Sequence, residues 1–442
     1  MASLDQLLGT LARLGVTQAK HLAHELGVSQ PTVSRLIQAA GDRVCRMGQG
    51  RATHYARTRA LPDLGTRLPV YWISETGRLE PSGTLHLLDE GRLWFSAPDD
   101  TGTLFEGLPP FASDMSPQGY IGRTFSSRYP ELELPSRLGD WNDDHRLIAL
   151  ARRGEDCIGD TIIGEESLNR WLASTPEPVE RTAYPELARR SAREQPGSSA
   201  GGENPKFLTY SGGRHVLVKF ASDDEGAVAR RWRELLVCES LALQVVRHAG
   251  IDAATAHWFD ERGYRFLEVE RFDRLGERGR RGVISLEALD NEHIGDAGRG
   301  ASWTRIAPKL LERKLIDSED ARRLRWLDVF GQLIGNTDRH FGNVSFLETR
   351  EGALRLAPVY DMLPMMFAPS SMTVVDRPFE PEPPTAETLD VWANAARHAH
   401  GFWTRVIDCA ALGDDFRALA RQCRSGLEAL RDRVPPLPEQ AP

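Results

Sequence analysis

Three oxygen-bearing side chains stand at a spacing that could support chemistry. The stretch Leu333–Phe346, LIGNTDRHFGNVSF, is apolar at both ends and polar between them, and Asn343 follows Asp338 by five residues. Asp361 comes eighteen residues later, after the apolar run LRLAPVY. Phosphoryl transfer uses one aspartate to accept a hydroxyl proton, and an asparagine and a second aspartate as hard oxygen ligands for Mg²⁺. A polar turn between two buried segments is the competing interpretation, and the bare pattern favours it.

A lysine upstream could supply the cation that such a site needs, with a glutamate as its partner. Lys219 ends the apolar run HVLVKF, which predicts a buried strand. Glu239 follows Leu236 by three residues on the apolar face of a predicted helix, where an unpaired carboxylate would be costly to bury. A lone strand lysine usually reaches solvent. The buried glutamate changes that expectation, because kinases pair a strand lysine with a helix glutamate to position the phosphates of ATP.

A loop of small residues precedes this strand. The segment GSSAGGENPKF, residues 197–207, contains Ser198, Ser199, Gly201 and Gly202. Backbone N–H groups in such a loop can approach phosphate oxygens closely, because glycine adds no side chain and tolerates positive φ. Surface linkers have the same composition, so the loop by itself is a weak signal.

A predicted hairpin after the helix ends in YRFLEVERFDR. In a kinase, the strand at this place leads into the hinge, the segment that holds adenine through its backbone. Main-chain groups of Glu270 and Phe272 would hold adenine there, and Asp273 would reach the ribose. An ordinary strand end fits the pattern equally well.

In the polar stretch, His340 lies between Asp338 and Asn343 and could contact phosphate. Bracing of its loop by hydrogen bonding is the favoured role.

The order of the segments favours phosphoryl transfer more than any one of them does. The chain resembles the HipA family of bacterial serine/threonine kinases, the toxin components of HipBA-type modules. The segments that carry the resemblance are, in order, SSAGGENPK, VLVKF, VERFDR, DRHFGN and PVYD. The resemblance covers roughly residues 65–430. It implies a two-lobed, protein-kinase-like α+β fold, ATP and Mg²⁺ as cofactors, and a protein substrate. Relatives in that family phosphorylate aminoacyl-tRNA synthetases.

The resemblance also implies a role for each matching residue. Asp338 is the implied catalytic base, and Asn343 and Asp361 are the implied metal ligands. The expected ATP contacts are Lys219, Glu239, Glu270, Phe272, Asp273, Ser198, Ser199, Gly201, Gly202 and His340. The serine loop is also implied as a site of autophosphorylation, which would add about two negative charges where the nucleotide phosphates belong. Ser198 and Ser199 both remain candidates for that modification.

The first sixty residues form a basic head on an acidic chain. They carry eight Lys or Arg and three Asp or Glu, a net charge of +5, whereas the whole chain carries −8. Two amphipathic helices are predicted in the segment TQAKHLAHELGVSQPTVSRLIQAAG, the first ended by Gly27 and the second capped by Ser29. RVCRMGQGRATHYARTR predicts a short hairpin. This order resembles the winged helix-turn-helix domains of bacterial regulators, and it resembles the YjjJ-like subgroup of HipA-like proteins, in which the head is fused to the kinase chain.

The head predicts DNA binding through the second helix and the hairpin. The expected contacts are Gln30, Thr32, Ser34, Arg35, Gln38, Arg46 and Arg51, with Arg57 and Arg59 also placed along the hairpin. A helical pair used only for protein contacts is the competing interpretation. The concentration of positive charge in this part of the chain favours DNA.

Length and composition predict several domains in a soluble, cytoplasmic protein. Hydrophobic residues make up 40% and charged residues 27% of the 442 residues, which suits a chain that buries a sizeable core. Five scattered cysteines form no CxxC pair, so neither a zinc site nor a disulfide scaffold is expected, and no apolar run is long enough for a membrane helix. We expect residues 1–62 as the head, 63–180 as a HipA-type N-terminal subdomain and linker, 181–300 and 301–434 as the two lobes, and 435–442 as a disordered tail.

The leading hypothesis is a protein serine/threonine kinase with a fused DNA-binding head, acting as a toxin. One alternative is a DNA-binding transcriptional regulator whose kinase-like body does not catalyse. A less favoured alternative is a nuclease that uses the acidic residues to hold a metal for DNA cleavage. A separate antitoxin and a homodimer both remain open.

Overall fold

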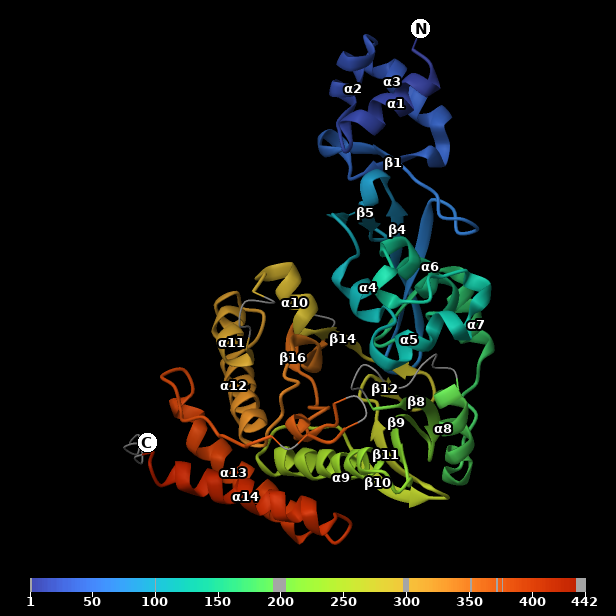
Figure 1. Ribbon diagram of the computed structural model, residues 1–442. Coiled ribbons are helices and arrows are strands. Elements are labelled where there is room, and N and C mark those ends of the chain that lie inside the picture. The colour runs from blue at the N-terminus through green and yellow to red at the C-terminus, as the bar shows by residue number, and fades with distance from the viewer. Residues whose placement is uncertain are drawn as a thin grey trace. The chain divides into compact units, whose positions relative to one another are not determined.

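The computed structural model describes residues 2–99, 101–193, 204–296, 302–349, 352–370, 373–375 and 377–434. The chain divides into two compact units. Residues 1–118 and 129–175 form the first, and residues 119–128 and 176–442 form the second, so that the segment between the two parts of the first unit belongs to the second unit. Figure 1 shows the elements of both units by residue number. None of the described helices has the length and apolarity needed to cross a bilayer.

The head of the first unit contains three helices followed by a two-stranded hairpin. These elements are α1 (Leu4–Leu14), α2 (Ala19–Leu26), α3 (Gln30–Ala40), β1 (Val44–Met47) and β2 (His54–Arg57). Gly27 ends α2 in the left-handed conformation, as its position predicts. Ser29 is the N-cap of α3 by position, although its hydroxyl pairs with that of Thr32, 3.0 Å away, and not with the backbone. The order of elements is that of a winged helix-turn-helix.

The remainder of the first unit is an antiparallel sheet with helices. The sheet has the order β6-β5-β4-β3-β7, and its elements are β3 (Arg67–Ile73), β4 (Leu79–Leu87), β5 (Leu93–Ser96), β6 (Gly102–Phe105) and β7 (Thr161–Ile163), with α4 (Pro110–Met115), α6 (Asp143–Arg153) and α7 (Glu165–Ala173). Each neighbouring pair of these strands is antiparallel.

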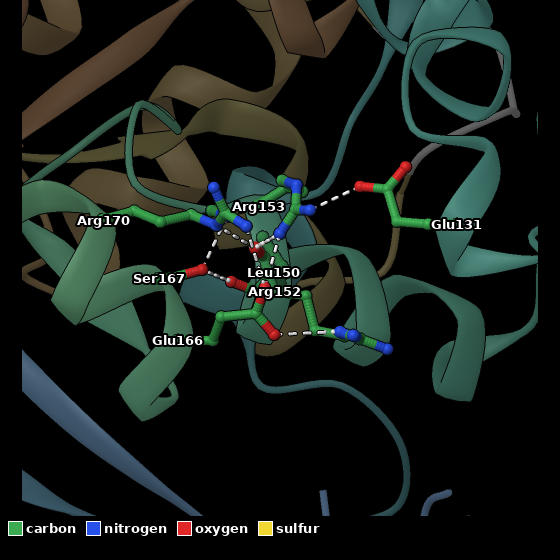
Figure 2. A network of polar contacts seen from close by, with 8 residues as sticks. Glu131, Leu150, Arg152, Arg153, Glu166, Ser167 and Arg170 are labelled. Carbon is green, nitrogen blue, oxygen red and sulfur yellow. Dashed lines mark hydrogen bonds and ion pairs between the residues drawn. The ribbon is translucent and has the colours of Figure 1, made fainter. Parts of the chain in front are cut away.

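A polar network fastens α6 to α7 (Figure 2). The guanidinium of Arg153 donates to Glu166 at 2.6 Å and also binds Glu131, while Arg152 donates to the same Glu166 at 3.0 Å. Ser167 donates to the carbonyl of Leu150 at 2.7 Å. Because the Ser167 hydroxyl is buried, this bond satisfies a polar group that would otherwise be costly inside the unit.

The hairpin of the head packs against the sheet of the same unit. A small apolar cluster joins them, made of Cys45, Met47, Ala56, Leu88 and Trp94. Arg57 forms an ion pair with Asp89, and Arg59 with Asp144 at 2.6 Å. These two arginines therefore hold the hairpin to its own unit. Sequence distance hid these acidic partners, and a place for the two arginines along a DNA backbone stays a prediction.

The second unit begins with a four-stranded antiparallel sheet of order β10-β11-β9-β8. The strands are β8 (Lys206–Ser211), β9 (Arg214–Ser222), β10 (Ala256–Glu261) and β11 (Tyr264–Glu270), and the helices on the sheet are α8 (Tyr184–Arg193) and α9 (Ala227–His248). Val216, Val218 and Phe220 pack with Tyr184 of α8. Alternate residues along β9 therefore point to the other face, toward α9, and Lys219 is one of them.

Helices make up most of the rest of the second unit. They are α5 (Gly119–Arg128), α10 (Leu286–His293), α11 (Trp303–Glu312), α12 (Ser318–Leu333), α13 (Leu389–Asp408) and α14 (Asp414–Arg431). Short strands complete it: β12 (Arg274–Leu275), β13 (Gly279–Arg280), β14 (Gly282–Ser285), β15 (Ser345–Glu348) and β16 (Leu354–Leu356). One continuous apolar core runs from α9 through α11 and α12 to α13 and α14, with Trp303, Phe330 and Trp403 among its largest side chains.

A buried carboxylate on the α8 face of the sheet gives a test of this packing. The Tyr184 hydroxyl donates to Glu268 at 2.9 Å, and Glu268 is only 4% exposed. Replacement of Tyr184 by Phe removes a hydrogen bond to a buried charge, so the free energy of unfolding should fall by about 1.5–3 kcal/mol. Urea denaturation measures this change.

The control is Tyr264→Phe in the same aromatic cluster. Among the described residues the Tyr264 hydroxyl has no hydrogen-bond partner, while its ring packs on Phe266 and Phe220. The control should change the free energy of unfolding by much less than Tyr184→Phe. Equal losses from the two variants would show that the bond to Glu268 contributes nothing to stability.

Candidate active site

A buried ion pair joins the sheet of the second unit to α9. The ammonium of Lys219 donates to both carboxylate oxygens of Glu239, at 2.8 and 2.7 Å, and the two side chains are 7% and 1% exposed. Lys219 also contacts the carboxylate of Asp361, far along the chain. The pairing that the helix-face argument predicts is therefore present, and it includes a third residue.

The three groups shift one another's protonation. Burial raises the pKa of Glu239 to about 6, against the attraction of Lys219. Burial would also raise the pKa of Asp361, but the cations Lys219 and Lys206 outweigh it and lower this pKa to about 2. Burial would lower the pKa of Lys219, but Asp361 and Glu239 outweigh it and raise this pKa. Lys219 and Asp361 are therefore charged at neutral pH, and the ammonium serves two carboxylates.

Lys206 is a second cation at this place. It is the cross-strand partner of Lys219 in the β8–β9 ladder, so both side chains point to the same face. Like charges directly opposite each other on a sheet are unfavourable. Within the described part of the chain the Lys206 ammonium forms no hydrogen bond or ion pair. From the sequence alone Lys206 has no separate role. The available signal is that Asn204 and Lys206 are polar residues two positions apart in NPKF, which places both on one face of an extended chain.

Asn204 adds an unsatisfied amide where the chain enters β8. Its side chain is 8% exposed, and among the described residues neither its nitrogen nor its oxygen has a hydrogen-bond partner. Buried amide groups are nearly always satisfied, and an exception calls for a physical reason. A polar ligand bound beside Lys206 would supply the missing partners.

The segment carrying Asp338 is pinned from several sides. The side chain of Asn336 accepts from the Asp338 backbone N–H at 2.9 Å, directly after α12 ends. Arg339 donates to Asp328 of α12 at 2.9 Å and also binds the Asn336 carbonyl. The carboxylate of Asp338 itself is about half exposed, at 51%. The backbone is thus held while the functional group stays accessible.

His340 braces the same loop, as favoured from the sequence. Its Nδ1 accepts from the Gly342 N–H at 3.1 Å and caps the short 3-10 helix Phe341–Asn343. The indole of Trp303 donates to the His340 carbonyl at 3.2 Å. The other ring nitrogen, Nε2, lies 3.9 Å from Asp338, so the ring flanks the carboxylate.

Asn343 and Asp361 present oxygen atoms suited to a hard cation. The Asn343 amide nitrogen donates to the Asp338 carbonyl at 2.8 Å, which leaves the amide oxygen available as a ligand. Asp361 adopts a left-handed backbone, with φ of 51°. Among the described residues no group of three or more His, Cys, Asp or Glu could hold a metal by itself. Magnesium fits this donor set, because it takes one or two protein oxygens and completes its shell with phosphate and water.

The predicted hinge follows β11. The Glu270 N–H donates to Thr255 at 2.8 Å, and the Arg271 N–H to His215 at 3.0 Å. The Glu270 carbonyl and the Phe272 N–H have no partner in the described residues, so the main-chain groups expected to meet adenine are unused.

The two other hinge side chains have partners within the protein. The ring of Phe272 stacks on Tyr360 with centroids 5.8 Å apart. The carboxylate of Asp273 is 3% exposed and binds both Arg271, at 2.9 and 3.0 Å, and Arg274, at 2.6 Å. Asp273 is thus committed to two guanidinium groups, and a role at the ribose would require it to exchange them.

The remaining predicted residues fall into two groups. Ser198, Ser199, Gly201 and Gly202 lie outside the described residues, as does the side chain of Arg51. On the head, Gln30, Ser34, Arg35, Gln38 and Arg46 are exposed, whereas Thr32 is half-buried beside Ser29. The outward face of α3 is therefore polar and accessible, as a reading helix requires.

Comparisons with known proteins agree with this arrangement. Residues 64–172 match the family described as YjjJ-like toxin, middle domain, and residues 198–429 match the HipA-like C-terminal domain. The chain is 35% identical over 434 residues to Toxin YjjJ of Escherichia coli (strain K12), covering 95% of this chain and 97% of that protein. A chain from the Shewanella oneidensis MR-1 complex of HipA, HipB and operator DNA superposes with a TM-score of 0.51 at 17% identity, covering 83% of this chain and 97% of that one.

The fold and the matched C-terminal domain define a HipA-like protein. The chain belongs to the family of YjjJ-like toxins.

The buried ion pair gives a prediction with a sign that depends on pH. In Lys219→Met, Glu239 loses its cation while staying buried, and the free energy of unfolding should fall by about 3–5 kcal/mol at pH 8. Burial raises the pKa of Glu239 to about 6 even beside Lys219, and loss of this cation raises it further, so the carboxyl is protonated at pH 5 and the loss of stability should be smaller there. Urea denaturation at the two pH values measures both effects.

The double variant Lys219→Met/Glu239→Leu is the matched control. Replacing both partners of a buried ion pair by apolar groups is far less harmful than removing one. The double variant should recover most of the stability that Lys219→Met loses at pH 8. A double variant as unstable as Lys219→Met would show that packing of the lysine stem, and not the pairing of charges, is what matters.

Proposed function

We propose that the protein is a serine/threonine kinase that transfers the γ-phosphate of ATP to a target protein. The observation that carries the proposal is the Lys219–Glu239 pair bound to Asp361 in a HipA-like fold. Lys219 would hold the α- and β-phosphates, and Lys206 and the amide of Asn204 would meet the remaining phosphate oxygens. The free carbonyl of Glu270 and N–H of Phe272 would hold adenine.

A proton-transfer role for Asp338 is part of the proposal, and the position of its carboxylate supports it. Its carboxylate is half exposed on a pinned loop, so it can accept the proton of a substrate hydroxyl as the hydroxyl oxygen attacks the γ-phosphorus and ADP leaves. Asn343 and Asp361 would hold Mg²⁺, which supplies positive charge to the phosphate oxygens. His340 keeps the loop in shape without taking part in the proton transfer.

The head would bind DNA through α3, and the family suggests a role in a toxin–antitoxin system. The curated relative is named a toxin, and the structural neighbour was solved with HipB and operator DNA. For this chain we propose an operator near its own gene, a cytoplasmic location, and a translation-related target such as an aminoacyl-tRNA synthetase. Autophosphorylation at Ser198 or Ser199 would oppose nucleotide binding.

The central test is phosphate transfer by the purified chain. Asp338→Asn keeps the shape of the loop and removes the base, so transfer from labelled ATP to the protein itself or to a lysate should fall about 10²- to 10⁴-fold. Asp415→Asn, on the exposed start of α14, should leave transfer unchanged.

Other outcomes of that experiment would point elsewhere. Wild-type protein that transfers no more phosphate than Asp338→Asn would leave a regulator with a non-catalytic body. Cleavage of plasmid DNA without ATP, lost in Asp361→Asn, would identify a metal-dependent nuclease in place of a kinase.

Operator binding depends on the exposed face of α3. Arg35→Ala and Gln38→Ala should each weaken binding to DNA from upstream of the gene by about 5- to 100-fold, as expected for side chains that contact bases. Fluorescence anisotropy at several salt concentrations measures this, and wild-type affinity should fall steeply as salt rises. Arg78→Ala removes an exposed charge elsewhere in the same unit and should have little effect. Equal losses from Arg35→Ala and Arg78→Ala, with none from the neutral change Gln38→Ala, would assign binding to overall charge and not to α3.

A further inference from the structure

Tyr360 meets three parts of the candidate site at once. Its ring stacks on Phe272 at the hinge, with centroids 5.8 Å apart. Its hydroxyl donates to the carbonyl of Gly342 in the catalytic loop at 3.0 Å and lies 2.7 Å from the hydroxyl of Ser345 at the start of β15. The next residue in the chain is Asp361.

The directions of these hydrogen bonds follow from the atoms. A carbonyl only accepts, so the single proton of the Tyr360 hydroxyl goes to Gly342. Ser345 must then donate to Tyr360, because the phenol oxygen has no second proton to give. Ser345 is 4% exposed and its backbone belongs to the β14-β15-β16 sheet, so the chain of bonds starts from a fixed point.

The peptide unit between Gly342 and Asn343 is held at both of its polar atoms. Tyr360 binds its carbonyl, and its N–H donates to the His340 carbonyl at 3.1 Å. This peptide unit carries one expected metal ligand, Asn343, while the peptide that follows Tyr360 carries the other, Asp361. One tyrosine hydroxyl therefore connects the backbones of two ligands that stand eighteen residues apart in the sequence.

We propose that Tyr360 is a positioning residue whose hydroxyl sets the separation between Asn343 and Asp361 for binding of the divalent cation. This deepens the proposed kinase function and rests on it. The proposal concerns the hydroxyl and not the ring contact with Phe272, because removing only the hydroxyl leaves that contact unchanged. Groups that orient metal ligands without touching the metal typically affect metal affinity or activity 10- to 100-fold.

The test uses Tyr360→Phe in the full-length chain and measures metal binding apart from catalysis. Mn²⁺ serves as the probe, titrated into the protein–ADP complex and followed by electron paramagnetic resonance of the free ion. The dissociation constant for Mn²⁺ should rise about 10-fold or more. Binding of ADP without metal should stay within about twofold of wild type, because the ring and the hinge remain. In the kinase assay kcat should fall, and the half-saturating Mg²⁺ concentration should rise, with little change in KM for ATP.

Two further variants keep the proposal open to refutation. Ser345→Ala removes the donor to Tyr360 and should raise the Mn²⁺ dissociation constant in the same direction, with the double variant no worse than Tyr360→Phe by more than about twofold. Tyr264→Phe, away from the site, should bind Mn²⁺ like wild type.

The outcomes separate this proposal from the one on which it rests. Wild-type Mn²⁺ affinity in Tyr360→Phe overturns the positioning role, even if phosphate transfer by the wild-type chain is demonstrated. Failure of the wild-type chain to bind ADP and Mn²⁺ at all overturns both proposals. An equal loss of metal-free ADP binding and of Mn²⁺ binding in Tyr360→Phe shows general disturbance of the site and also overturns the positioning role.

Discussion

The arrangement of the second unit depends on the charge of one buried ammonium. Lys219 is on a central strand facing α9, and a cation there is tolerated only when carboxylates neutralise it. Glu239 must therefore lie on the inner face of α9, and Asp361 must be brought to the same point by the segment after Tyr360. That requirement fixes the strand, the helix and the later loop relative to one another before any ligand is considered.

The arginines of the head are used in two ways, some in ion pairs within the protein and others as exposed surface charge. Arg57 and Arg59 look like neighbours of Arg46 in the sequence, yet they form ion pairs with Asp89 and Asp144 of the adjoining sheet. Positive charge in the hairpin thus contributes to holding the head in its unit, and only part of it is left for a polyanion. The net charge of the first sixty residues overstates the surface available to DNA, and the exposed face of α3 is the better measure of it.

The parts of the site that could be predicted from sequence are those encoded locally. Glu239 was recognisable because a carboxylate on an apolar helix face demands a partner, and Asp338 with Asn343 because both lie on one short loop. Lys206 was recognisable only in part, since its position opposite Lys219 depends on strand register. The contacts of Asp273 and the bonds of Tyr360 could not be predicted, because buried guanidinium pairing and a hydroxyl between two loops depend on the tertiary structure. Residue type and spacing indicate what a site must contain, whereas long-range pairing decides which groups remain free to act.

Charge counting links the unliganded site to its proposed regulation. Lys206 and Lys219 balance Glu239 and Asp361, so this group of four is close to neutral when Glu239 is ionised. On the proposed function, a nucleotide with its magnesium would add about two negative charges, and Lys206 and Lys219 are the cations of this group that would face them. A phosphate group on Ser198 or Ser199 would bring a similar charge of about −2. On the proposed function, a phosphorylated serine loop that reached these lysines would exclude ATP by charge as well as by volume, whichever of the two serines carries the phosphate.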